Sequence, residues 1–233
     1  FVTVRDGRLY AGDRRLRIWG VNTCFGANFP APDEAAKIAA HLAKLGVNGV
    51  RIHHHDNANA PRGLWKAVID GVRRLDPDQL ARQDYFLDQL HRRGIYANLN
   101  LHVSRTLTEA EGFIRRDLPR KFRYNKYLLY FEPRMRKAFK DFCREYLLHR
   151  NPYRRPGGLR RVDDPGIALI EITNENPFSR EGPEPAATLP EPYRAEFRRQ
   201  WNAWLTRQYP DTRSLREAWG EGGEPLGEDI VTR

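Results

Sequence analysis

Short apolar runs alternate with amphipathic stretches along most of the chain. Four runs rich in aliphatic and β-branched residues have the length of buried strands: Leu16 to Asn22, Val47 to His53, Ile95 to His102 and Ile167 to Thr173. Between them, apolar residues recur at helical spacing in three segments that open near a proline: 32–45, 76–93 and about 132–148. Strands that alternate with helices at this pace predict βα units around a parallel sheet.

The two ends of the chain differ from this pattern. Residues 1–15 carry the turn signal Asp6–Gly7 between β-type runs, which predicts a hairpin. After the fourth strand, 179–192 is rich in Pro, Glu and Gly and predicts a loop. Aromatic residues then recur at helical spacing from Tyr193 to Tyr209, where a core-facing helix face is favoured over a sugar-stacking surface. A short helix over 212–219 follows, and nothing beyond it resembles another complete βα unit.

The chain is strongly basic, with a formal net charge of +10 over 233 residues. A basic face can attract nucleic acid or an acidic polymer, and arginines cluster here at Arg115, Arg116, Arg120, Arg123, Arg150, Arg154, Arg155, Arg160 and Arg161. They alternate with acids and form no nucleic-acid motif, so a solvated surface is favoured and no nucleic-acid partner is expected. No apolar run approaches the roughly 20 residues of a membrane helix, and no membrane contact is expected.

Alternation along the third strand predicts a polar interior. Asn98, Asn100 and His102 share one face of this strand, and the residues between them are apolar. The apolar face suits packing against helices, which leaves the polar face for the inside of a barrel, with His102 at the lip. Because buried asparagines are costly unless hydrogen-bonded, the pattern implies a polar network.

The second strand adds an arginine and two histidines. Arg51, His53 and His55 share one side by alternation. An inward arginine near a carboxylate site would hold glutamates ionised and correctly oriented, although for Arg51 taken alone an ordinary structural ion pair is the favoured explanation. His53 and His55 beside Asp56 invite a metal interpretation, but no further ligand set is visible. Hydrogen bonding to substrate or a carboxylate suits the histidines better, and neither metal nor cofactor is expected.

The fourth strand carries the strongest candidate for chemistry. Its sequence IALIEITNENP ends the apolar run with Asn174 and Glu175. A carboxylate at the carboxyl end of such a strand lies where α/β barrels perform catalysis, so Glu175 is predicted to be a catalytic acid/base, with a surface-loop carboxylate as the alternative. Strict alternation places Glu171, Thr173 and Glu175 on one face, and Asn174 points away unless the strand bulges at its end.

Together these segments resemble clan A glycoside hydrolases, most nearly glycoside hydrolase family 5, the cellulase and mannanase group. FVTVRDGRLYAGDRRLRIWGVN resembles their opening hairpin and first strand, which ends on Asn22. LGVNGVRIHHHD resembles the family's second strand, and the arginine of that strand falls on Arg51. GIYANLNLH resembles the third strand, and its histidine falls on His102. In IALIEITNENP the family's Asn-Glu pair falls on Asn174 and Glu175. WNAWLTRQYPDTRSLREAWG resembles a segment common in β-galactosidase-like members.

The resemblance implies a (β/α)8 barrel and a retaining hydrolysis of O-glycosidic bonds in a polysaccharide or oligosaccharide. Glu175 would protonate the glycosidic oxygen and later deprotonate water, and Asn174 would bind the sugar 2-hydroxyl. Arg51 and His102 would support the carboxylates. Asn22 would join the substrate-binding histidines at positions 53 and 55. Residues 1–15 would form a hairpin that caps the barrel.

A retaining mechanism also needs a glutamate nucleophile about 5–5.5 Å from the acid/base. The family carries it on the seventh strand, and none of the later carboxylates caps an apolar strand: Glu217, Glu221, Glu224 and Glu228. We therefore expect residues 1–233 to be the N-terminal four to five βα units of a truncated catalytic domain, with the nucleophile beyond residue 233. The isolated chain is expected to be inactive and to need the missing half of the barrel as its partner.

Two rival functions remain open at this stage. One is a β-galactosidase-like clan A hydrolase, which shares the Asn-Glu strand, and the other is a non-catalytic carbohydrate-binding protein derived from a barrel. The sequence does not specify the sugar, the linkage or exo against endo action. An extracellular or periplasmic location is favoured, although the chain contains no recognisable signal peptide.

Overall fold

The computed structural model describes residues 1–105, 107–113, 126, 128–154, 157–176, 189 and 191–220. Several features singled out in the sequence lie outside these residues. They are most of the predicted loop 179–192, Pro177, the arginines Arg115, Arg116, Arg120, Arg123 and Arg155, and the carboxylates Glu221, Glu224 and Glu228.

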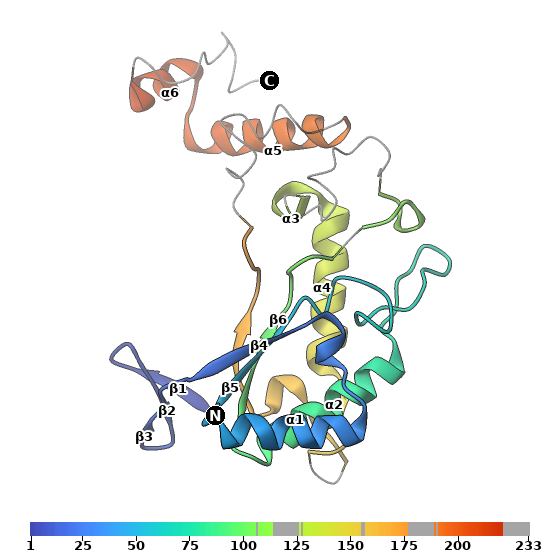
Figure 1. Cartoon of the computed structure of the whole chain (residues 1–233). Coiled ribbons are helices and arrows are strands. Elements are labelled where there is room, and N and C mark those ends of the chain that lie inside the picture. The colour runs from blue at the N-terminus through green and yellow to red at the C-terminus, as the bar shows by residue number, and fades with distance from the viewer. Residues whose placement is uncertain are drawn as a thin grey trace.

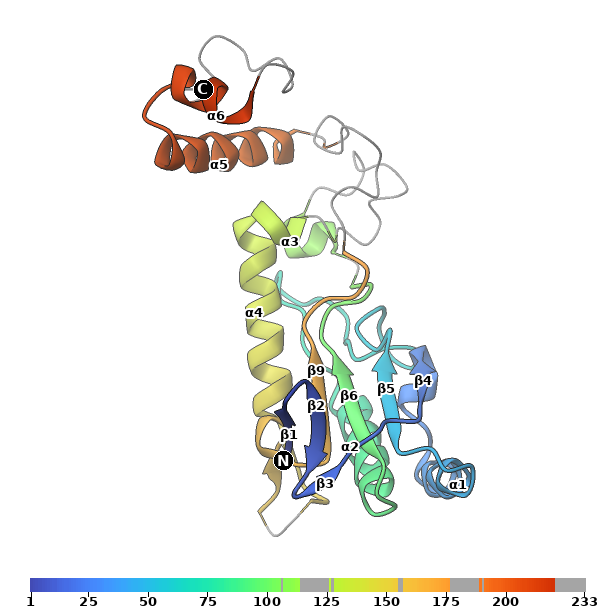
Figure 2. The same cartoon turned by 90° about the vertical axis from the view of Figure 1, so that its left-hand side faces the viewer.

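Four parallel strands form the central sheet. In spatial order they are β4 (Gly20–Cys24), β5 (Gly49–His53), β6 (Tyr96–Asn100) and β9 (Ile167–Glu171). Spatial order follows chain order, so each crossover leads to the neighbouring strand, as in a (β/α)8 barrel (Figures 1 and 2). The barrel is open: among the described residues, the edge strands β4 and β9 each pair with one strand only. The predicted parallel sheet is confirmed, and the fold is a partial α/β barrel.

The first strand begins four residues later than predicted. Leu16 lies just after the strand Arg14–Arg15 and its backbone N–H donates to the Leu9 carbonyl at 2.8 Å, and Trp19 is 69% exposed. The parallel strand starts at Gly20, which lies against Gly49 of β5. A Cβ atom on Gly20 would approach the Gly49 carbonyl oxygen to 3.2 Å, so the small residue allows this close contact between the strands.

Three long helices cover one face of the sheet: α1 (Pro32–Lys44), α2 (Pro77–His91) and α4 (Pro133–Leu148) (Figures 1 and 2). Each has proline at its first position, and two have a carboxylate cap. Asp76 accepts from Asp78 and Gln79 N–H at 2.9 and 3.0 Å, and Glu132 accepts from Met135 N–H at 2.7 Å. The main core lies between these helices and the sheet.

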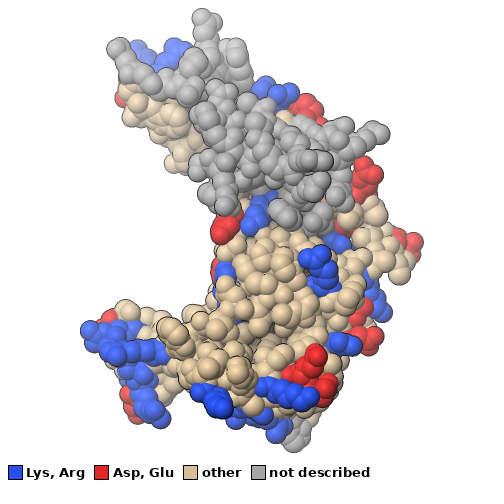
Figure 3. Space-filling view, in the orientation of Figure 1, with Lys and Arg blue, Asp and Glu red and all other residues tan. Residues whose placement is uncertain are grey.

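The N-terminal hairpin forms as predicted and gains a third strand. The antiparallel order is β1 (Val2–Arg5), β2 (Arg8–Ala11) and β3 (Arg14–Arg15), turning at Asp6–Gly7 with φ angles of 48° and 69°. It extends away from the four-stranded sheet, and basic side chains gather over it (Figure 3). That it caps a barrel stays a prediction.

The remaining elements lie towards the other end of the molecule or in crossovers. They are the 3₁₀ turns Phe25–Asn28, Glu109–Glu111 and Arg161–Asp163, the paired β7 (Arg150–Asn151) and β8 (Leu159–Arg160), and the helices α3 (Leu128–Phe131), α5 (Tyr193–Gln208) and α6 (Thr212–Trp219). None of the helices that the structure describes is long and apolar enough to cross a membrane.

Helix α5 follows the fourth strand but packs away from the sheet, against α3 (Figure 1). Its Phe197 ring meets Phe131 edge-on at 5.3 Å. The predicted core-facing aromatic stripe is only half correct. Tyr193 is buried, whereas Trp201 and Trp204 are each 40% exposed and stack on one another at 5.3 Å. Sequence periodicity identified the helix and could not specify which neighbour would cover it.

Candidate active site

Arg51 organises the polar groups at the carboxyl ends of the strands. Its Nε donates to Glu171 Oε2 at 2.8 Å and its Nη2 to Glu171 Oε1 at 2.6 Å. The same Nη2 donates to Asn174 Oδ1 at 2.7 Å. The Arg51 and Glu171 side chains are 23% and 27% exposed, so this bidentate pair is partly shielded from water. One guanidinium thus fixes both a carboxylate and the side-chain amide of Asn174.

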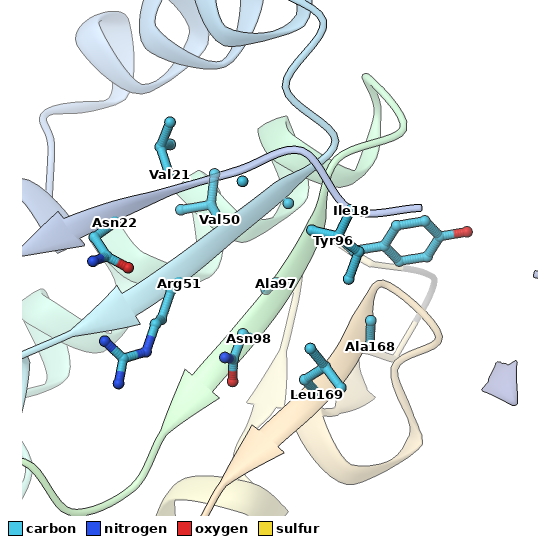
Figure 4. A pocket seen from close by; sticks show the side chains of 12 residues that line it. Ile18, Val21, Asn22, Val50, Arg51, Tyr96, Ala97, Asn98, Ala168 and Leu169 are labelled. Atoms are coloured by element: carbon cyan, nitrogen blue, oxygen red, sulfur yellow. The ribbon is translucent and has the colours of Figure 1, made fainter. Parts of the chain in front are cut away.

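Strand register explains why these groups meet. Asn22 pairs with Arg51 and Arg51 with Asn98, so the three share the inner face, and Asn100 pairs with Glu171 on that face. Figure 4 shows Asn22, Arg51 and Asn98 extending from three adjacent strands to the same side. Towards the amino ends of the strands this face is hollowed by a cavity of about 270 Å³.

The backbone leaves regular strand geometry immediately after Glu171. Asn174 N–H donates to the His102 carbonyl at 2.9 Å, and Glu175 has a φ of 43°. Lys126 Nζ donates to the carbonyls of Asn174 at 2.8 Å and Glu175 at 3.3 Å. The alternation rule therefore ends with the strand, and Asn174 turns to the side of Arg51 instead of away from it.

Glu175 lies at the rim of this group and is exposed. Burial lowers the pKa values of His53 and His54, and the negative charge of Glu175 opposes part of that shift. The backbone that carries Glu175 follows Glu171, the residue at which β9 ends. The carboxylate is thus at the carboxyl-terminal end of the sheet, close to two imidazoles.

His53 lies beside Arg51 in the site. It is 9% exposed, and its Nδ1 is 3.3 Å from the Asn100 amide nitrogen. Burial, and then the positive charges of Arg51 and His54, lower the pKa of His53 to about 4. The imidazole is therefore neutral at pH 7 and offers a hydrogen-bonding ring rather than a charge.

His55 does not share the face of Arg51, and this part of the prediction is wrong. It is fully buried on the helix side, where its ring lies 5.1 Å from Tyr146 and 6.4 Å from Phe142, and its Nε2 is 2.5 Å from the Asn100 carbonyl. The cause is His54, whose φ of 52° breaks the alternation after β5. His53 and His55 consequently do not converge on one metal ion.

His102 is also buried instead of lining the mouth. Its ring is fully covered, packs 5.5 Å from Phe139 of α4 and places Nδ1 3.8 Å from Asp56 Oδ2. Burial lowers its pKa to about 3, helped by the charges of Lys126 and Arg105. The contact of His102 with the site is through its backbone carbonyl, which accepts from Asn174. β6 ends at Asn100, so side-chain alternation no longer applies at 102.

Two buried residues that sequence reasoning did not assign to this role hold the loops around the site. Asn28 donates from Nδ2 to the His53 carbonyl at 2.7 Å. Asp56 accepts from the N–H groups of Val103, Ser104 and Arg105 at 2.8 to 3.2 Å, which fixes the segment after β6. No spacing in the sequence distinguishes them from ordinary loop residues. In the described part of the chain, no group of three His, Cys, Asp or Glu side chains could hold a metal ion.

The sequence matches no protein-family model and no curated protein. Solved structures nevertheless share the fold. The endo-1,4-β-mannanase from Rhizomucor miehei has a TM-score of 0.61 at 18% identity, over 75% of this chain and 48% of that one. A glycoside hydrolase family 5 mannosidase from the same organism has a TM-score of 0.59 at 19% sequence identity, over 76% of this chain and 49% of that one. The hyperthermostable endo-1,4-β-D-mannanase from Thermotoga petrophila has a TM-score of 0.53 at 16% sequence identity, over 84% of this chain and 53% of that one.

These comparisons define the class of fold. The chain has the architecture of a partial α/β barrel, and it spans about half the length of the solved structures it matches. At this level of identity the likeness concerns the fold, and the roles of individual side chains must be argued from their own geometry.

Proposed function

We propose that this chain supplies the acid/base half of a retaining glycoside hydrolase that acts on a β-1,4-linked polysaccharide such as mannan. The observation that carries the proposal is the contact of one guanidinium with both Glu171 and Asn174, directly beside Glu175, at the carboxyl end of a parallel sheet. The shared fold with mannanases supports the class of reaction and suggests the substrate.

In the proposed reaction, Glu175 protonates the glycosidic oxygen as the bond to the anomeric carbon breaks. It then removes a proton from the water that releases the sugar. Asn174 uses its Oδ1 to accept from Arg51, which leaves its amide hydrogens directed elsewhere to donate to the sugar 2-hydroxyl. Neutral His53 contributes hydrogen bonding beside the substrate.

The nucleophile is proposed to come from the strands that complete the barrel. Glu171 is a poor candidate, because both of its oxygens accept from Arg51 and it belongs to the strand rather than to the segment beyond it. A second carboxylate about 5–5.5 Å from Glu175 is what a retaining mechanism requires. The 233-residue chain alone is accordingly expected to give no turnover.

The test uses Glu175→Gln in protein that contains the completing strands, on the same or a separate polypeptide, assayed on β-1,4-mannan. Loss of the proton donor is expected to lower kcat by about 10²–10⁴-fold. On an aryl β-mannoside whose phenolate leaves without protonation, azide should restore turnover in Glu175→Ala and give a glycosyl azide of retained configuration, because azide attacks the glycosyl-enzyme without a general base. Glu34→Gln, an exposed change on α1, serves as the control.

Four outcomes would contradict the proposal. Full activity of Glu175→Gln would show that Glu175 is not the acid/base. Turnover by the isolated chain would show that no second half of the barrel is needed. Binding of manno-oligosaccharides without turnover, even in the completed barrel, would instead favour the carbohydrate-binding alternative. A preference for β-galactosides would favour the β-galactosidase-like alternative.

A further inference from the structure

A second hollow lies outside the candidate active site, between the loop that follows β5 and the helix α4. It has a volume of about 650 Å³. Its wall includes Trp65, residues 71–74, Arg105 and Glu111, and the side of α4 from Arg134 to Glu145. We call it the arginine groove because six of its described lining residues are cationic and three are acidic: Arg73, Arg74, Arg105, Arg134, Lys137 and Arg144 against Glu111, Asp141 and Glu145.

The floor of the arginine groove holds two buried guanidiniums and one carboxylate. Arg105 lies over the Trp65 ring at 4.5 Å and Arg73 at 5.3 Å. Glu111 lies between them, with Oε1 2.8 Å from Arg105 Nη2 and Oε2 3.7 Å from Arg73 Nη1. These three side chains are only 5–7% exposed. Positive charge therefore outweighs negative charge among the three.

The floor also contains a buried guanidinium nitrogen of Arg105 that has no acceptor within the described chain. The Nε of Arg105 is buried and unpaired, while its Nη1 and Nη2 donate to the Ala138 carbonyl and to Glu111. An unsatisfied buried donor on a charged group costs free energy, and because this atom is covered, an anion in the groove offsets that cost through its charge rather than through a direct hydrogen bond. A negatively charged ligand in the groove would therefore stabilise the floor.

The rim of the arginine groove adds further positive charge, and only part of it is neutralised by ion pairs. Lys137 is paired with Asp141 at 2.6 Å and Arg134 with Glu132 at 2.8 Å. The exposed guanidiniums of Arg74 and Arg144, in contrast, form no hydrogen bond or ion pair within the described chain. Planar guanidiniums bind carboxylate and sulfate groups through paired hydrogen bonds, which makes an oxyanion the matching ligand.

We propose that the arginine groove binds the oxyanion of an acidic saccharide, either a carboxylate or a sulfate ester. The assignment to a saccharide rests on the proposed function, whereas anion binding by itself does not. Asp56 anchors the segment from Val103 to Arg105 to the carboxyl end of the sheet, so the groove is joined rigidly to the candidate active site. The groove's described aromatic rings are buried, which offers nucleic-acid bases no stacking surface.

The experiment measures binding to the 233-residue chain by calorimetry at constant ionic strength. Trigalacturonate supplies carboxylates, a sulfated disaccharide supplies sulfate esters, and inorganic sulfate supplies the anion alone; mannotriose is the neutral probe. Arg74→Gln/Arg144→Gln removes two rim charges. Arg14→Gln/Arg15→Gln removes two exposed charges from β3 and is the matched control. Arg105→Lys keeps the floor charge but removes the fork of donors.

Inorganic sulfate and at least one acidic saccharide are expected to bind, and mannotriose is not. The rim double variant, or Arg105→Lys, should weaken binding at least tenfold, with the β3 variant within twofold of the parent chain. Equal binding of mannotriose, or unchanged binding in both groove variants, overturns the proposal. Sulfate binding without either acidic saccharide, or tighter binding of a single-stranded oligonucleotide, overturns the saccharide assignment. None of these readouts depends on hydrolysis, so they remain informative if the proposed function fails.

Discussion

At the residue scale, three consecutive histidines have three different environments. His53 lies on the inner face of the sheet, His55 is buried against α4, and His54 between them stacks on Phe25 at 4.7 Å and contacts Ser104 Oγ at 2.8 Å. The positive φ of His54 produces this division. Identical side chains in sequence therefore have distinct roles, and only His53 lies beside Arg51.

The buried neutral histidines predict that the folded chain loses stability as the pH falls. Burial lowers the pKa of both His55 and His102 to about 3. Between that value and a pH of about 6.5, the unfolded chain binds protons at these sites and the folded chain does not, so the free energy of unfolding rises with pH through this window. Each such histidine contributes about 1.4 kcal/mol per pH unit to the slope.

His55→Gln should reduce that slope by about 1.4 kcal/mol per pH unit in urea unfolding between about pH 4.5 and 6. The exposed His41→Gln on α1 is the control for replacing a histidine by glutamine. Burial raises the pKa of Asp56, which acts in the opposite sense, but Asp56 is present in every variant and cancels in the comparison. Parallel pH profiles for His55→Gln and the parent chain would refute the prediction.

At the element scale, the crossover between β5 and α2 is an irregular loop with its own tight packing. Its backbone folds back so that Leu64 N–H donates to the His55 carbonyl at 2.9 Å and Trp65 N–H to the Ala58 carbonyl at 3.3 Å. Gly63 lies inside this fold, where a Cβ atom would clash with the Ala58 carbonyl oxygen. The clashing atom belongs to the backbone, so no flexible side chain can move aside to relieve the contact.

Gly63→Ala is therefore expected to lower the free energy of unfolding by about 1–3 kcal/mol, the usual cost of overpacking. Chemical denaturation monitored by tryptophan fluorescence measures it, since the loop contains buried Trp65. Gly26→Ala is the control, because its Cβ would meet only the Pro61 carbonyl oxygen at 3.6 Å, an ordinary contact. Equal stability of the two variants would contradict this account of the loop.

The order of elements was predictable from the sequence, because apolar runs and helical spacing are local properties. Positions just past a strand end were not. His55, His102 and Asn174 all lie shortly beyond the last residue with strand geometry, where alternation stops. The resemblance to a family drew attention to Asn174 and Glu175 at the end of the fourth strand. It could not reveal which side chains the irregular backbone would bury.

At the scale of the whole molecule, the edge strands β4 and β9 are less covered than the central strands β5 and β6. α1, α2 and α4 share one apolar core with the sheet, whereas α5 contacts α3 (Figure 1). Ile170 and Ile172 consequently remain 43% and 64% exposed, and β9 has an unpaired edge within the described chain. An apolar, unpaired strand edge favours association with another chain.

We therefore expect the isolated chain to self-associate through β9. Its net charge of +10 opposes contact between copies, so association should strengthen as salt screens the repulsion. Sedimentation velocity at increasing protein concentration in about 0.15 M salt measures it. Ile172→Lys should weaken association, whereas Ile69→Lys adds the same charge at a 67% exposed isoleucine in the β5–α2 loop and should not. A chain that stays monomeric at all concentrations, or equal effects of the two substitutions, would show that this edge does not mediate contact.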